Sequence, residues 1–174
     1  MRLFIKSIFV FTVLSLLSCT QSSDKTLPKY KKATKQDWVE ANKILAEKET
    51  ELIESFINRR HWKMTKCDIG IWIEKTSSTN NKTINKGNKV TYSYSLELLD
   101  GTTLSSSDEN KPETVIIGSG KIIRGLDYAF RQLKLDEEAK IIIPSHLGYG
   151  LLGDQKTIPP RAILYYQIKI LTVE

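Results

Sequence analysis

Residues 115–133, which read VIIGSGKIIRGLDYAFRQL, contain the change of pattern that decides the fold. They begin as a short β-branched run, which favours a buried strand. Gly118 and Gly120 interrupt this run, and glycine tolerates the positive φ that a sharp turn requires. Beyond them, apolar residues recur at helical spacing from Ile122 to Leu133. The stretch therefore predicts a strand that turns sharply into a short helix, whose apolar face other segments must cover.

The segments around this helix alternate between apolar and polar residues in the manner of β-strands. We expect strands at residues 69–74, 90–99, 102–104, 113–117, 139–143 and 162–173, the last with apolar residues on both faces. Asp100 and Gly101 favour a hairpin turn between the second and third of these strands. Residues 105–112 and 145–160 are polar or rich in glycine, and we expect loops there. The second half of the chain therefore predicts an α+β class, in which a sheet covers one short helix.

The first residues of the chain read as a leader. Arg2 and Lys6 give it a positive start, and residues 8–17 form an apolar core that is too short to span a bilayer comfortably. The core ends in Leu-Leu-Ser before Cys19, which resembles the bacterial lipobox. We therefore expect a lipoprotein signal peptide at residues 1–18 and lipidation of Cys19. An ordinary secretory signal and an uncleaved membrane anchor are the alternatives.

Lipidation would determine where the protein resides. Each buried methylene of an acyl chain contributes about 0.8 kcal/mol, so several chains on Cys19 would form a firm anchor. Residues 19–36 are polar and rich in lysine and serine, which is typical of a flexible tether. The sequence thus predicts a membrane-anchored lipoprotein, periplasmic or associated with the outer membrane, whose soluble body lies outside the cytoplasm.

A helix is expected at residues 37–62. Asp37 and Glu40 have the spacing of a capping box, which places the start of the helix at Asp37. Its expected apolar stripe consists of Trp38, Ala41, Leu45, Leu52 and Phe56. Such a stripe suits a helix that packs on the body or holds the body away from the membrane, with dimerisation as the alternative.

Composition and motifs argue against several classes of function. The formal net charge of +6 is scattered, without the interleaved aromatics of a nucleic-acid-binding face. Residues 118–121 lack the first glycine and the hydroxyl of a phosphate loop, and serines 105–107 lack a nucleophile elbow. His61, His146 and Cys67 are too dispersed for a zinc site. Once the leader cysteine is lipidated, no second thiol is left for an intramolecular redox pair. We expect Cys67 to be buried, with a reactive site as the alternative.

A set of apolar and aromatic residues from the expected strands, helix and last loop remains to be assigned. These are Tyr94, Leu104, Ile122, Ile123, Leu126, Tyr149, Ile158 and Tyr166. The backbone N–H groups of Ile122 and Ile123 lie at a helix start, where donors lack intrahelical acceptors. An apolar pair beside free donors suits a neutral ligand that carries a carbonyl, such as a peptide.

Five pieces of the second half, taken in order, resemble the FKBP-type peptidyl-prolyl cis-trans isomerases. They are Leu99-Asp100-Gly101, Asn110-Lys111-Pro112, Ile122-Ile123-Arg124-Gly125-Leu126, Tyr149-Gly150 and Ile158-Pro159-Pro160. The resemblance runs from about residue 87 to residue 174 and implies an antiparallel, strongly curved sheet wrapped on one short helix, within an isomerase domain at residues 64–174. With the lipobox and the N-terminal helix, the chain also resembles the gliding-motility-associated FKBP-type lipoproteins.

The resemblance implies isomerisation of X–Pro bonds without a metal or a cofactor. Rotating a peptide bond costs about 18–20 kcal/mol, and an apolar pocket lowers this barrier by stripping water from the amide. The implied catalytic residues are Tyr94, Ile123, whose backbone N–H would hold a substrate carbonyl, and Tyr149, whose hydroxyl would face the substrate. The implied walls and floor of the substrate pocket are Leu104, Ile122, Leu126, Ile158 and Tyr166. The expected partners are proline-containing exported polypeptides and the membrane, and no nucleic acid.

Three positions depart from the family pattern. Leu126 replaces a tryptophan on the pocket floor, Ser105 replaces an aspartate, and Glu113 replaces an aromatic wall residue. The resulting pocket is more aliphatic and has fewer polar anchors, so we expect a low specificity constant through weak binding. The alternative to a folding assistant is therefore a non-catalytic FKBP-like binding or assembly lipoprotein, for instance one of a gliding-motility apparatus.

Overall fold

The computed structural model describes residues 32–174. The chain divides into two units, Met1–Thr34 and Lys35–Glu174, and the elements below all belong to the second unit. The expected signal peptide, Cys19 and most of the expected tether lie outside the described residues. Among the helices that the structure describes, none is both long enough and apolar enough to cross a membrane.

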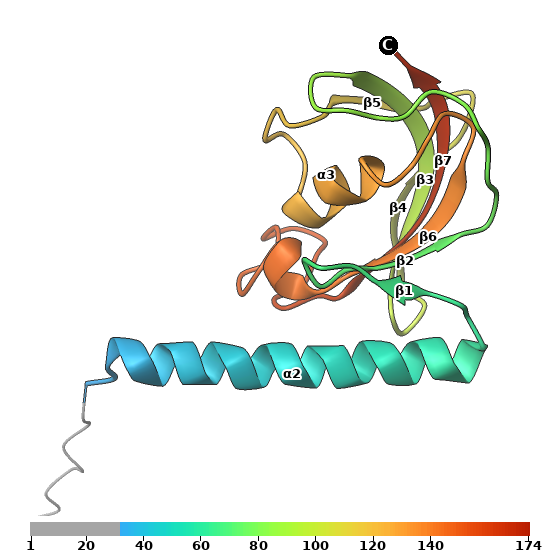
Figure 1. The fold of residues 1–174 in the computed structure, drawn as a ribbon. Helices are drawn as coiled ribbons and strands as arrows, with labels where there is room; N and C mark the ends of the chain where they lie inside the picture. The colour runs from blue at the N-terminus through green and yellow to red at the C-terminus, as the bar shows by residue number, and fades with distance from the viewer. Residues whose placement is uncertain (1–31) are drawn as a thin grey trace, which may run out of the picture. The chain divides into compact units, whose positions relative to one another are not determined.

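The second unit combines two α-helices, a short 3-10 helix and a seven-stranded sheet (Figure 1). In chain order its elements are α2 (Lys35–Arg60), β1 (Thr65–Lys66), β2 (Trp72–Lys75), β3 (Lys89–Leu98), β4 (Thr103–Ser107), β5 (Glu113–Ile116), α3 (Arg124–Phe130), β6 (Glu138–Ile143), η2 (Ser145–Leu147) and β7 (Leu164–Val173). Every expected strand is present near its predicted position, and β1 is an addition.

All the strands pair in antiparallel fashion. Their order is β1-β2-β6-β7-β3-β4, and β5 also pairs with β3. The long central pair is β3 and β7, in which the register shifts between Thr91 and Tyr92. A second shift, between Leu96 and Glu97, interrupts the pairing of β3 with β4. Such irregularities increase the twist of a sheet, and the sheet curves around α3 as Figure 1 shows. The predicted class, a curved antiparallel sheet wrapped on one short helix, is confirmed.

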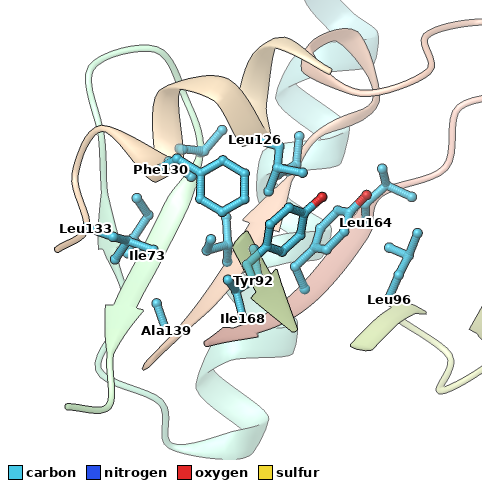
Figure 2. Close-up of a cluster of buried hydrophobic side chains, with 14 of the residues drawn as sticks. Ile73, Tyr92, Leu96, Leu126, Phe130, Leu133, Ala139, Leu164 and Ile168 are labelled. Carbon is cyan, nitrogen blue, oxygen red and sulfur yellow. The ribbon is translucent and has the colours of Figure 1, made fainter. Parts of the chain in front are cut away.

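The helix α3 is held against the inner face of the sheet by its buried residues. The ring of Phe130 meets the ring of Tyr92 edge-on, with 4.8 Å between the centroids. Figure 2 shows Leu126 and Phe130 on the side of α3 that faces Tyr92. At Gly125, a Cβ atom would lie 2.5 Å from the Cγ2 of Ile143, so glycine is what lets the helix backbone approach β6 this closely. The change of pattern in the sequence thus forms the centre of the core.

The helix α2 packs against the opposite face of the sheet. Its contact is a second apolar cluster formed with side chains of β2, β6 and β7. The cluster members are Ile53, Phe56, Ile57, Trp72, Ile142 and Tyr165. The Arg60 guanidinium covers this cluster, 3.7 Å above the ring of Phe56. Because neighbouring strand residues point to opposite faces, Tyr165 joins this cluster while Tyr166 points to the core around α3.

The buried face of α2 overlaps the predicted stripe only in part, since Phe56 is buried as predicted but other members of the stripe are not. Trp38 and Leu52 are 63% and 59% exposed, whereas Glu49 and Ile53 are buried. The helix also begins two residues before Asp37, which lies in the first turn instead of at the cap. Apolar residues occur on more than one side of this helix. The side that packs against the outer face of the sheet is therefore the one that is buried.

Two strand boundaries differ by three residues from those predicted. The strand β2 begins at Trp72, because the residues before it form a turn in which the N–H of Gly70 donates to the carbonyl of Cys67 at 2.8 Å. The strand β4 continues to Ser107, into a segment predicted to be a loop. Pairing with β3 supplies the hydrogen bonds that hold these polar residues in a strand.

Candidate active site

A cavity of about 590 Å³ lies between the inner face of the sheet, the start of α3 and the loop after η2. All the residues predicted for the pocket line it except Leu104. They are Tyr94, Ile122, Ile123, Leu126, Tyr149, Ile158 and Tyr166. Residues that are more than 70 positions apart in the chain thus meet around one space, because β3 and β7 are neighbours in the sheet.

Aromatic rings and aliphatic side chains form the depth of this cavity. Tyr94 and Tyr166 lie on adjacent strands, and their ring centroids are 6.0 Å apart. Tyr92 adds a ring 5.8 Å from that of Tyr94. Leu96, which is paired with Tyr166, and Leu126 of α3 are both 4% exposed. The alternation of β3 and β7 places these side chains on one face of the sheet, where they form an apolar wall of the cavity.

The turn before α3 contains a residue, Ile123, that lines the cavity and whose backbone donor has no acceptor among the described residues. Ile123 occupies the N-cap position in an extended conformation, and its carbonyl accepts hydrogen bonds from Leu126 and Asp127. No described residue accepts a hydrogen bond from the Ile123 N–H. Asp127 in turn accepts a hydrogen bond from the Gly118 N–H at 2.6 Å and pairs with Arg131 at 3.0 Å. The helix therefore fixes the glycine turn that carries Ile122 and Ile123.

The strand β4 contributes Ser105 to the cavity, whereas Leu104, which was predicted as a wall residue, does not line it. In the pairing with β3, Leu96 lies opposite Ser105 and Glu97 lies opposite Thr103, so Leu104 falls in a bulge. Its half-buried side chain packs against the main core and does not line the cavity. The Ser105 hydroxyl instead lies 3.1 Å from that of Tyr94, in a hydrogen bond that orients the tyrosine.

The residues that form this cavity lie within a part of the chain that matches a known protein family. The family model described as FKBP-type peptidyl-prolyl cis-trans isomerase matches residues 80–171, which is just over half of the chain. The chain belongs to this family. The matched residues contain β3 to β6 and nearly all of β7, and thus every element that lines the cavity.

Individual relatives agree with the family match. An FK506-binding protein of Neisseria meningitidis serogroup C is 37% identical over 102 residues, which are 58% of this chain and 94% of that protein. The Drosophila melanogaster peptidyl-prolyl cis-trans isomerase Fkbp12 is 42% identical over 89 residues, or 51% of this chain and 82% of that one. The human peptidyl-prolyl cis-trans isomerase FKBP9 is 38% identical over 87 residues, and the matched part is only 15% of its length.

The fold comparison extends to a solved structure. The crystal structure of FkpA from Escherichia coli superimposes with a TM-score of 0.65 at 21% identity, over 79% of this chain and 64% of that one. At this level of identity, the likeness concerns the fold alone. It covers more of the chain than the family model does.

In this FKBP-type chain, Tyr149 lies on the loop that follows η2 and is 38% exposed. The Ser145 carbonyl accepts hydrogen bonds from the N–H groups of Gly148 and Gly150, and the Gly150 carbonyl accepts one from Arg161. Burial, and secondarily the negative charge of Asp154, raises the pKa of the Tyr149 phenol. Its hydroxyl therefore stays protonated at neutral pH, and Tyr149 lines the cavity.

Sequence reasoning missed Asp154, which organises the wall at Ile158. One oxygen of its carboxylate accepts hydrogen bonds from the backbone N–H groups of Lys156, Thr157 and Ile158 at 2.9, 2.9 and 2.7 Å. These bonds, that of Ile158 foremost, lower the pKa of the Asp154 carboxyl. A Cβ atom at Gly153 would overlap the carbonyl of Ile158. The Gly-Asp pair ahead of the Ile-Pro-Pro stretch was the signal that could have pointed to this tight turn.

The cavity holds phenols that remain neutral. Burial raises the pKa values of Tyr92 and Tyr166, so both stay protonated throughout the physiological range. Lys121, Glu113 and Asp154, which carry charge, also line the cavity. The site therefore combines neutral phenols and apolar walls with a few charged side chains.

The described residues contain no group of three or more His, Cys, Asp or Glu side chains placed to hold a metal ion. Cys67, which was expected to be buried, is a half-buried free thiol. Burial, and then the charge of Asp68, raises the pKa of this thiol, which favours its unreactive form at neutral pH. The cavity lining includes neither residue.

Proposed function

We propose that this chain isomerises X–Pro bonds in exported polypeptides at a membrane surface. The observation that carries the proposal is the N–H of Ile123, which has no acceptor among the described residues and belongs to the lining of a cavity walled by Ile158 and Tyr166. A peptide offers that donor a carbonyl, and a proline ring offers those walls an apolar surface of matching size. Membership in the FKBP-type family supports the same activity.

The proposed mechanism needs only binding and desolvation. When the prolyl C–N bond twists, its resonance is lost and the amide becomes less polar, so an apolar site favours the twisted state over the planar one. The rings of Tyr94 and Tyr166 provide that environment, and the Ile123 N–H holds a neighbouring carbonyl while the bond rotates. Tyr149 would donate a hydrogen bond that keeps the substrate in register. No covalent step is involved.

The membrane location is proposed from the leader sequence. A lipid on Cys19 would anchor the chain, and the polar residues that follow would separate the body from the bilayer surface. An isomerase held there meets polypeptides as they emerge from export, when their X–Pro bonds still populate both isomers. Cell fractionation tests this part, because Cys19→Ser would then release the folded protein from the membrane pellet.

The activity itself is testable by following the cis-to-trans rate of a proline-containing peptide with the purified full-length chain. We expect Tyr149→Phe to lower kcat/KM by roughly 2- to 12-fold, because it removes one neutral hydrogen bond. Leu152→Ala serves as the control, since Leu152 is 70% exposed and does not line the cavity. A wild-type rate equal to the uncatalysed one across several peptides would refute the proposed activity.

A non-catalytic binding or assembly lipoprotein is the second candidate, and Leu126 is the observation that favours it. A leucine at this buried position offers a proline ring less contact than a tryptophan, which weakens binding at about 25 cal/mol per Å² of lost apolar contact. We expect Leu126→Trp to tighten the binding of proline peptides, since the new ring can extend into the cavity that Leu126 lines. Calorimetric titration measures this. Unchanged affinity in a folded Leu126→Trp variant would mean that peptides bind elsewhere.

A further inference from the structure

A second cavity, of about 470 Å³, lies between α2 and the loop that follows β6. In Figure 1 this loop, drawn in orange, faces the middle of α2. The helix lines the cavity with Leu45 and Ala46, and the loop lines it with Gly150 and Leu151. We call this space the α2 groove. The residues of the groove are distinct from those of the candidate active site.

The two walls of the α2 groove are fixed to each other. The carboxylate of Glu49, which is 4% exposed, accepts hydrogen bonds from the N–H and the hydroxyl of Ser145 at 2.9 and 2.7 Å. An oxygen of the same carboxylate lies 3.7 Å from the guanidinium of Arg161. The groove is therefore preformed, and an occupant would not have to bear the cost of ordering its walls.

The α2 groove is continuous with the candidate active site along one stretch of chain. Tyr149 lines the active-site cavity, and the next two residues, Gly150 and Leu151, line the groove. The loop here is unusually apolar for an exposed segment, since Leu151 and Leu152 are 57% and 70% exposed. A polypeptide whose proline occupies the first cavity can cross Tyr149 and enter the groove within a few residues, because an extended chain spans about 3.3 Å per residue.

The chemistry of the groove indicates what it holds. Leu45, Ala46 and Leu151 offer an apolar seat, while Lys43 and Arg161 supply positive charge beside it. The Glu49 carboxylate lies 3.7 Å from the Arg161 guanidinium and balances one of these two charges, so Lys43 leaves the groove with a net positive charge. An apolar side chain with an acidic residue next to it complements both features.

We propose that the α2 groove binds a second segment of the same polypeptide whose X–Pro bond occupies the active site, by an apolar residue that has an acidic neighbour. This inference rests on the proposed function and deepens it, because it makes long, unfolded polypeptides the preferred substrate class. The helix α2 then serves as part of the substrate-binding surface and does more than connect the domain to its tether.

The test compares peptides that share one X–Pro core. One is a tetrapeptide. The others carry an extension of about eight residues, placed before the core in some peptides and after it in others, and each extension spans roughly 26 Å. The extension carries either Leu-Glu or Leu-Lys. We expect the full-length wild-type chain to favour a Leu-Glu extension over the tetrapeptide by roughly tenfold in kcat/KM and in affinity, the effect of one partly buried leucine.

Two variants alter the groove and one serves as the matched control. We expect Leu151→Asp, which adds a negative charge, and Ala46→Phe, which fills the space, to abolish the advantage of the extended peptide. Both should leave turnover of the tetrapeptide unchanged. Leu152→Asp introduces the same charge one residue further along, outside the groove lining, and should retain the advantage.

The outcomes separate this inference from the proposed function. Extended peptides that gain nothing over the tetrapeptide, or that keep their gain in both groove variants, would overturn the inference while leaving the isomerase activity intact. A wild-type chain that turns over no peptide would refute the activity, and the affinity ratio of extended to short peptide would still decide the groove. A change of oligomeric state in the groove variants, seen by sedimentation, would assign the groove to a second copy of the chain and also overturn the inference.

Discussion

Glu49 is a single carboxylate through which the N-terminal helix determines the position of the loop that bears Tyr149. Both of its oxygens are engaged by Ser145, whose carbonyl holds the backbone of that loop. Removing the carboxylate would leave a buried N–H and a buried hydroxyl without acceptors, at about 1–3 kcal/mol for each. We expect Glu49→Ala to lower the free energy of unfolding by about 2–6 kcal/mol, the sum for the two groups, measured by urea denaturation, and to lower kcat/KM as well.

The control at this scale is Glu49→Gln, which keeps one acceptor oxygen and should restore part of the loss. A double-mutant cycle with Ser145→Ala should show an interaction energy well above the roughly 0.3–0.5 kcal/mol within which independent sites add. Additive losses would mean that Glu49 stabilises α2 without acting on the loop.

At the scale of the element, α2 is held to the sheet by a few side chains on one face. Phe56 is 2% exposed and contacts the rings of Trp62 and Tyr165 at centroid distances of 5.5 and 6.2 Å. We expect Phe56→Ala to cost about 3–5 kcal/mol of stability, as for other buried aromatic side chains.

Leu52 lies on the same helix and was predicted to be buried, but it is 59% exposed. Thermal or urea unfolding of Leu52→Ala should therefore stay within about 0.5 kcal/mol of the wild type, and a large loss there would place the buried face on the other side of α2.

At the scale of the whole molecule, stability depends on segments outside the family match. The strand β2 pairs with β6 from Trp72 to Lys75, and Ile71 and Ile73 belong to the main core. The chain from residue 35 should therefore melt higher than one from residue 64, which lacks α2. One from residue 89, which also lacks β2, should lose its cooperative transition, because burying less apolar surface leaves too little free energy to offset chain entropy. Calorimetry of the three fragments checks this, and equal melting temperatures would show that neither α2 nor β2 stabilises the domain.

The sequence by itself determined the elements and the faces of the central strands. The alternation of β3 predicted that its apolar residues share one face, and the strand–glycine–helix pattern predicted α3 with Ile123 at its start. These predictions depend on the period of side chains within one element, which neighbouring residues specify. Most of the pocket followed from the resemblance, because its residues occur in family order along the chain.

Only the tertiary structure decided the features that depend on a partner element. The bulge in β4 directs Ser105 into the cavity in place of Leu104, since the register with β3 is set by the sheet. The side of α2 that is buried is the side that packs against the outer face of the sheet. Trp38 lies outside this contact and is exposed. The bonds between Glu49 and the loop after β6 join residues almost a hundred positions apart. No local pattern records such contacts, because each depends on the surface that another part of the chain presents.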